Sequence, residues 1–244
     1  MSIIFNEKEH VELILQKSFQ TSRHKSFEMQ LLATYWREQG QDDKEIENNL
    51  HLFCKQHLNN YNRVAFLKII EEKVQKSKKR KLKVPTPINI TQTELDIIMS
   101  EENLKCQKLM FVYLVLAKYY MSINHTDKYY VGCTDNDIFK LCNMYTRKQE
   151  RLDFMHYLTK KGYIKPTLSM SSIVNYVNED SETVITLIPN NDMELYFEKY
   201  LGGNIINCVC CGSLTRKKSN RTKYCKECAE KINNDVKGYK KAIP

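Results

Sequence analysis

Two pairs of cysteines near the C-terminus constrain the fold of this chain more than any other feature. The first pair is Cys208 and Cys211, the second is Cys225 and Cys228, and 13 residues separate the pairs. The CxxC spacing brings two thiolates to neighbouring corners of a tetrahedron, the geometry of structural Zn²⁺ sites. Because four thiolates leave no coordination position for water or substrate, we predict one structural Zn²⁺ ion. Cys210 is a spare thiol beside this set.

The sequence around these cysteines, CVCCG and YCKEC, resembles small zinc ribbons of the CxxCG…YCxxC kind, found in phages and mobile elements of low-GC bacteria. The resemblance implies a zinc ribbon at 204–235, followed by a basic tail at 236–244. The segment between the cysteine pairs is cationic, so we expect the ribbon surface to bind phosphate; the alternative is a basic surface that docks on a protein. Its cations are Arg216, Lys217, Lys218, Arg221 and Lys223.

Positive charge is concentrated in two short stretches of the chain. Residues 73–83 contain seven Lys/Arg and no acidic residue, and residues 208–244 contain ten Lys/Arg against three acidic residues. Blocks of like charge stay solvated unless a polyanion binds them, so both stretches are candidate contacts for nucleic acid. The first belongs to a proline-containing segment at 76–90 that we interpret as a linker. This linker is either an arm that contacts phosphate or a simple solvated spacer. Its candidate contacts are Lys78, Lys79, Arg80 and Lys81.

The apolar stretches, the N-terminus and the cysteine pattern indicate the cellular location. The longest apolar stretch, Leu109 to Ala117, is far shorter than the roughly 20 residues of a membrane span. The N-terminus lacks the basic and apolar regions of a signal peptide, and the clustered cysteines are unlike a secreted disulfide framework. We therefore expect a cytoplasmic protein with no membrane partner.

The first 75 residues predict a small helical bundle. Apolar residues recur at helical spacing in four segments, for example Leu32 and Trp36 in the second. Gly40 is suited to end the second helix, Asp42 to start the third and Asn62 to cap the fourth. We expect this bundle at 1–75.

The next segment, 91–203, combines helices and short strands in an informative order. A long apolar helix at 103–121 precedes a two-turn helix, a turn at 143–145, a basic helix that ends at Gly162, and two strands. This order resembles winged helix-turn-helix domains. The resemblance implies that the second helix of the pair enters the major groove with its first residues on the bases. Those residues are Thr146, Arg147, Lys148, Gln149 and Arg151.

Three details of this segment are specific expectations. Thr146 and Gln149 have the spacing of a capping box. Leu152, Met155 and Leu158 are expected to hold the basic helix to the core. The strands at 173–177 and 183–188 are expected to form the wing. The acidic turn between them would repel phosphate. We therefore expect either that the wing faces away from DNA or that the domain binds protein instead. The acidic residues of that turn are Glu179, Asp180 and Glu182.

The predicted fold class is mainly α with small β elements: a helical bundle, a winged-helix-like α+β domain and a zinc ribbon. We find no glycine-rich phosphate loop, metalloprotease, nucleophile-elbow or deaminase motif, so we do not expect an enzyme. Our hypothesis is a zinc-containing DNA-binding protein of a phage or mobile element, active in transcription regulation or DNA replication. The alternative is a non-enzymatic adaptor or inhibitor that docks on a host protein complex, such as a polymerase or a defence nuclease.

Overall fold

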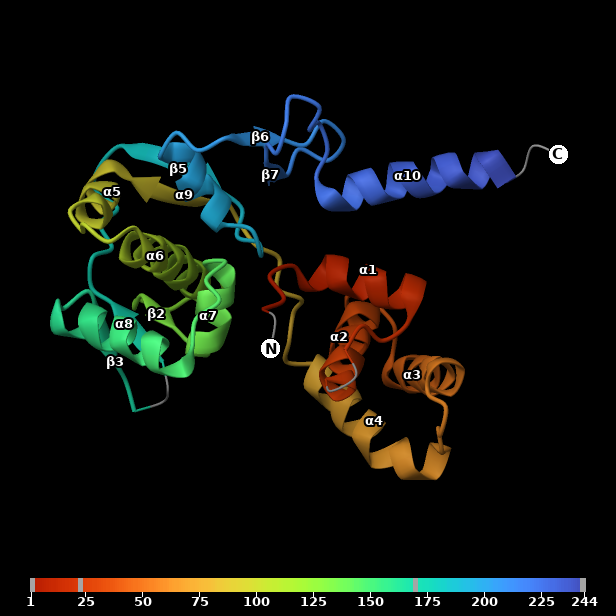
Figure 1. Ribbon diagram of the computed structural model, residues 1–244. Helices are drawn as coiled ribbons and strands as arrows, with labels where there is room; N and C mark the ends of the chain where they lie inside the picture. Colours follow the sequence, from red (N-terminus) through yellow and green to blue (C-terminus); the bar gives the residue numbers. More distant parts are fainter. Residues whose placement is uncertain (1–2, 22–23, 169–170, 242–244) are drawn as a thin grey trace. The chain divides into compact units, whose positions relative to one another are not determined.

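The computed structural model describes residues 3–21, 24–168 and 171–241, where four successive helices are followed by helices interspersed with small antiparallel sheets (Figure 1). This confirms the predicted fold class, mainly α with small β elements. The contacts divide the chain into one compact unit at Ile4–Pro85 and another that contains Thr86–Pro244. None of the helices among the described residues combines the length and the apolar composition needed to cross a bilayer.

The N-terminal unit is built from helices in the part of it that the structure describes. Its second helix contacts the other three, and Leu31 and Leu32 on that helix are completely buried in the core. Asp42 and Glu45 form a capping box at the start of the third helix, and Asn62 caps the fourth. The helices are α1 (Glu7–Lys17), α2 (Lys25–Glu38), α3 (Asp43–His57) and α4 (Arg63–Ser77).

The basic segment after α4 is folded onto this same unit. The Arg80 guanidinium pairs with the carboxylate of Glu7, a residue that is 3% exposed. The Glu7 N–H donates to the Lys83 carbonyl at 2.9 Å. The structure therefore differs from the predicted linker at 76–90, because part of it contacts the start of α1 and a strand begins at Ile88. The buried carboxylate of Glu7 needs a cationic partner, which Arg80 supplies. The basic composition of the segment does not reveal that one of its arginines has this role.

The second unit is organised around one long helix, α6 (Leu104–Asn124). Phe111 and Tyr113 on this helix are completely buried, which confirms the predicted central helix. It contacts α5, α7 and α9. The other helices that precede the cysteines are α5 (Gln92–Met99), α7 (Asp135–Leu141), α8 (Lys148–Lys160) and α9 (Glu194–Tyr200). The strands are β1 (Ile88–Thr91), β2 (Tyr130–Val131), β3 (Ile164–Pro166), β4 (Ser172–Val174) and β5 (Thr183–Leu187).

These strands form two separate antiparallel sheets, of order β2–β4–β3 and β1–β5. Ile173 pairs with Tyr130 and Lys165, whereas Ile185 pairs with Ile90. The predicted hairpin between the strands that flank the acidic turn is therefore wrong. A strand with alternating apolar and polar residues can pair with any antiparallel partner. The observed partner, β1, directly follows the prolines of the segment predicted as a linker.

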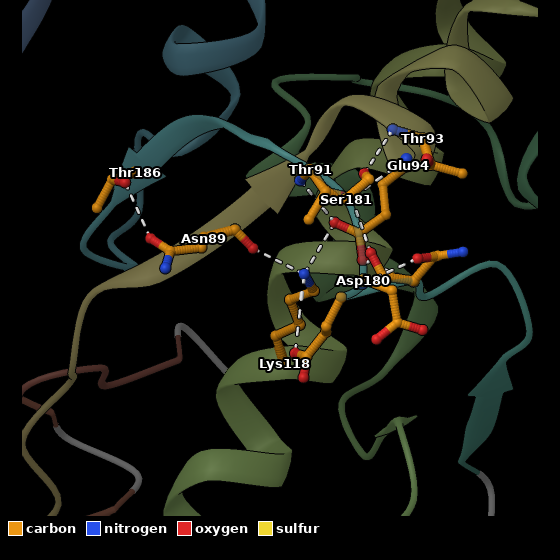
Figure 2. A network of polar contacts seen from close by, with 10 residues as sticks. Asn89, Thr91, Thr93, Glu94, Lys118, Asp180, Ser181 and Thr186 are labelled. Carbon is orange, nitrogen blue, oxygen red and sulfur yellow. Dashed lines mark hydrogen bonds and ion pairs between the residues drawn. The ribbon is translucent and has the colours of Figure 1, made fainter.

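The acidic turn at 178–182 is hydrogen-bonded to the start of α5, where a buried ion pair joins α5 to α6 (Figure 2). The Lys118 ammonium donates to Glu94 Oε2 at 2.8 Å. Glu94, which is completely buried, also accepts the N–H of Thr91 at 2.9 Å and the N–H of Asn178 at 2.9 Å. Glu179 lies 3.9 Å from the same ammonium. This turn is therefore a structural element of the β1–α5 region.

The C-terminal part consists of a short hairpin and a helix. β6 (Ile205–Asn207) pairs with β7 (Leu214–Arg216), and α10 (Lys226–Lys241) follows. The predicted boundary at 203/204 falls directly before β6. The predicted basic tail at 236–244 continues α10 as far as Lys241, and residues 242–244 lie outside the described part of the chain.

Candidate metal centre and basic surfaces

The predicted metal ligands come from two turns of the C-terminal part. Cys208 and Cys211 lie between β6 and β7, whereas Cys225 and Cys228 lie at the start of α10. The four sulfur atoms are all within 4.8 Å of one another, and 3.7 Å separates the sulfurs of Cys211 and Cys225. Cys210 is exposed and does not belong to this group. The four cysteines could therefore hold one metal ion.

Backbone hydrogen bonds hold the two cysteine turns together. The Gly212 N–H donates to the Cys208 carbonyl at 2.8 Å. Gly212 has a φ of +74°, in the left-handed region that glycine adopts without strain. The Val209 N–H donates to the Lys223 carbonyl at 3.0 Å and so connects the first cysteine turn to the segment before the second.

The pKa values of the thiols reflect their hydrogen bonds. The backbone N–H of Cys225 is the main cause that lowers the pKa of Cys208 to about 6. The Ser213 hydroxyl, whose oxygen is 3.0 Å from the sulfur, lowers the pKa of Cys211. The pKa of Cys228 is raised because its thiol donates to the sulfurs of Cys211 and Cys225. A cation that binds thiolates displaces such protons, so this donor set fits a thiolate-bound metal.

Arg216, which we predicted as a phosphate contact, connects β7 to α9. Its Nε donates to Glu198 Oε2 at 2.8 Å, and its Nη2 donates to Glu198 Oε1 at 2.9 Å and to Glu194 Oε1 at 3.1 Å. Lys108 of α6 donates to Glu198 Oε1 at 2.7 Å. Burial raises the pKa of Glu194 to about 7 although Arg216 acts against it. Arg216 is therefore engaged by carboxylates of its own unit.

Most of the remaining cations between the cysteine pairs face solvent. Lys218, Arg221 and Lys223 are exposed, and Lys217 is half-buried. Within the described part of the chain, none of these four has an ion pair with a carboxylate. Thr222 Oγ1 accepts the backbone N–H of Lys218 at 3.2 Å, which orders the turn that carries them.

The predicted capping box at the start of the basic helix is not formed. α8 begins at Lys148, and its N-cap residue, Arg147, makes no side-chain cap. The helix starts one residue later than the capping box requires, so Thr146 lies before the N-cap and its Oγ1 is buried without a hydrogen-bond partner. The Gln149 amide donates to Asp153 Oδ1 at 3.0 Å instead. The first turn of α8 thus has no side-chain acceptor for its N–H groups among the described residues.

The five predicted base contacts nevertheless lie together at this helix start. Arg147, Lys148 and Gln149 are exposed, whereas Thr146 and Arg151 are half-buried, and Arg151 Nη1 donates to the Thr146 carbonyl at 2.7 Å. Where α7 meets α8, a hollow of about 330 Å³ is lined in part by Arg147 and Arg151. Two further lining residues that the sequence analysis missed are Lys140 and Tyr145. Tyr145 is 89% exposed. An aromatic residue in the turn between two predicted helices was the sequence feature that could have identified it as part of this surface.

The prediction of which residues of α8 face the core is partly wrong. Leu158 is completely buried, but Leu152 is 46% exposed. Six residues at about 100° each place these two side chains about 120° apart around a helix, so one face cannot bury both. Leu152 therefore adds apolar surface beside the basic helix start.

The four cations predicted in the 76–90 segment have different surroundings. Arg80 pairs with Glu7, and the Lys78 ammonium contacts Asp43 Oδ2 at 2.6 Å. Lys79 and Lys81 are exposed and have no ion pair within the described residues. Two of the four cations are thus open to an external anion.

Comparisons with known proteins give no relative from which to infer the function. No protein family matches the chain, and no curated protein or solved structure shows significant similarity to it.

Proposed function

We propose that this chain is a non-enzymatic, zinc-containing DNA-binding protein that acts as a regulator or replication-associated factor of a phage or mobile element. The start of α8 contacts bases in the major groove. The ribbon cations without a carboxylate partner among the described residues, together with Lys79 and Lys81, bind the phosphate backbone. These ribbon cations are Lys217, Lys218, Arg221 and Lys223.

The observation that carries this proposal is the uncapped, cationic start of α8. The helix macrodipole and the N–H groups of the first turn attract phosphate oxygens. Arg147 and Lys148 are exposed beside them, with no ion pair among the described residues. Arginine and lysine match the acceptor pair of guanine, which gives this surface both affinity and base preference.

The strand pairing removes the main objection to DNA binding. In a winged helix-turn-helix domain the wing follows the recognition helix, and here the hairpin that follows α8 is β3–β4. Lys165 on this hairpin is exposed, and the acidic turn belongs to another part of the unit. The wing of the proposed interface therefore does not present the carboxylates that would repel phosphate.

The identity of the metal as Zn²⁺ follows from donor chemistry. Four thiolates in a tetrahedral arrangement bind Zn²⁺ as a closed structural site, which supplies folding energy rather than catalysis. Metal analysis of the purified chain should give one zinc per protein. Zero metal with a folded C-terminal part, or a different bound metal, would contradict this assignment.

DNA binding is tested by fluorescence anisotropy of the zinc-loaded protein with duplex DNA at two salt concentrations. We expect affinity to fall with salt by about 0.9 decade per decade of salt for each phosphate contacted. Arg147→Ala is expected to weaken binding about tenfold, the loss of one good base contact. Lys44→Ala removes an equal charge from the exposed start of α3 and serves as the control. No binding at low salt, or equal losses in both variants, would refute the proposal.

A second candidate function is docking on a protein complex. Tyr145 and Leu152 are exposed apolar side chains on or beside α8, and exposed aromatic and apolar residues favour protein partners. Under this alternative, Tyr145→Ala abolishes capture of the partner complex while duplex DNA is not bound at all.

A further inference from the structure

A second candidate site lies in the N-terminal unit, between the end of α3 and the start of α4. A pocket of about 700 Å³ opens there, within the size range of about 300–1,000 Å³ that suits small organic ligands. None of the described residues that line it is acidic. The lining residues are Asn48, His51, Leu52, Lys55, Leu58, Asn59, Tyr61 and Arg63.

The buried member of this lining is His51, which is 5% exposed. Its Nδ1 is hydrogen-bonded to the Tyr61 hydroxyl, whereas its Nε2 is buried with no hydrogen-bond partner. The nearest carboxylate oxygen, of Glu47, is 3.7 Å from Nε2, beyond hydrogen-bonding distance. Burial, and then the charge of Arg63, lowers the pKa of His51, so the imidazole is neutral near pH 7.

The tautomer of a neutral imidazole follows from its hydrogen bonds. When the Tyr61 O–H donates to Nδ1, the proton of the ring resides on Nε2. Nε2 is shielded from solvent, so a ligand in the open pocket does not reach it. His51 instead positions the Tyr61 hydroxyl at the pocket wall through Nδ1.

The rim of the pocket supplies positive charge. Lys55 and Arg63 are exposed, and neither has an ion pair within the described part of the chain. Asn48 and Asn59 add side-chain amides that both donate and accept. An oxyanion is the acceptor that this combination favours, because an arginine guanidinium and a lysine ammonium both bind phosphate oxygens.

The walls of the pocket are apolar and suit a planar or sugar-like group. Leu52 is 57% exposed, and Leu58 and the ring of Tyr61 are half-buried. A bare inorganic anion would leave these surfaces unused. A phosphate attached to a nucleoside uses both the cationic rim and the apolar walls.

We propose that this pocket binds a nucleoside phosphate, with the phosphate on Lys55 and Arg63 and the nucleoside against Leu52, Leu58 and Tyr61. The same chemistry is present in a free nucleotide and in the 5′-phosphorylated end of a nucleic acid strand. The site belongs to a different unit from α8 and the cysteine cluster, so it stands independently of the DNA-binding proposal.

The test is calorimetric titration of the zinc-loaded full chain with AMP and, separately, with inorganic phosphate. We expect AMP to bind and inorganic phosphate to bind more weakly. Arg63→Gln is expected to weaken AMP binding on the order of tenfold, as expected for a lost charge-assisted hydrogen bond. The matched control is Lys68→Gln, an exposed cation on the same helix that does not line the pocket. Both substitutions are on the surface, so the fold is expected to be retained.

Side-chain ¹⁵N NMR of His51 gives a readout within the pocket. AMP should shift the ring Nδ1 resonance of His51, because the nucleoside contacts Tyr61, the hydrogen-bond partner of Nδ1. A 5′-phosphorylated oligonucleotide that shifts the same resonance, when its 5′-hydroxyl counterpart does not, identifies a strand end as a source of the ligand. No AMP binding at millimolar concentration, equal losses for Arg63→Gln and Lys68→Gln, or an unmoved His51 resonance would overturn the proposal.

Discussion

Replacement of Lys118 by methionine tests the buried ion pair between α6 and α5, whose Glu94 carboxylate also accepts a hydrogen bond from the acidic turn. Lys118 is 4% exposed and Glu94 is completely buried. The substitution keeps most of the side-chain volume but removes the cation 2.8 Å from the Glu94 carboxylate. Of the partners of Glu94 among the described residues, the backbone N–H groups of Thr91 and Asn178 would then remain around a buried charge.

The size of the effect follows from that environment. Removal of one partner of a buried ion pair costs about 3–5 kcal/mol, because the other charge remains desolvated. We expect about 3 kcal/mol, the lower end, because the two N–H donors still stabilise the carboxylate. For a unit of this size, that corresponds to a decrease in Tm of about 6–12 °C.

Two spectroscopic probes separate the two units in this assay. Trp36 is the single tryptophan of the chain and lies in the Ile4–Pro85 unit. Its fluorescence transition should be unchanged in Lys118→Met, whereas the circular dichroism transition of the second unit should move to lower temperature. Lys128→Met, at an exposed position of the same unit, is the control and should leave both transitions in place. A decrease below about 2 °C, or an equal change at Trp36, would show that the ion pair does not have this role.

Three further outcomes are expected. Glu194→Gln should flatten the pH dependence of stability. The pKa of Glu194 is raised from 4.5 to about 7 in the folded state, so the free energy of unfolding falls as the pH rises from about 4.5 to about 7. A urea midpoint as pH-dependent as that of the parent would refute this. Cys228→Ser should abolish tight binding of Co²⁺, followed by its thiolate charge-transfer absorbance, whereas Cys210→Ser should retain one bound ion; equal losses would place Cys210 in the ligand set. Lys165→Ala should weaken DNA binding and lower its salt dependence by about one phosphate contact, whereas Glu182→Gln should leave anisotropy titrations unchanged; the reverse result would return the wing to the acidic turn.

Local chemistry made much of the fold predictable. The helices of the first unit have clear apolar faces and capping residues such as Asp42 and Asn62, and both residues cap helices as expected. The cysteine cluster was predictable because the CxxC spacing encodes its own geometry, and the four sulfurs are within 4.8 Å. In both cases the interactions join residues that are close in sequence or carry a specific motif.

Long-range pairing was not predictable in the same way. β5 pairs with β1, whose residues precede their partners by 92 to 99 positions, and the alternating sequence of β5 does not specify that partner. Arg80 and Arg216 belong to basic stretches that suggest phosphate binding, yet each pairs with carboxylates of its own unit. Sequence charge shows how many cations are present, but only tertiary structure shows which are free.

The most direct test of the proposed DNA interface is chemical-shift mapping of the ¹⁵N-labelled, zinc-loaded chain during titration with duplex DNA. We expect shifts at the amides of residues 146–151 and of the β3–β4 hairpin, with further shifts at 217–223. The acidic turn at 178–182 should remain unperturbed. Shifts confined to other surfaces, or a response at the acidic turn without one at α8, would contradict the proposed interface.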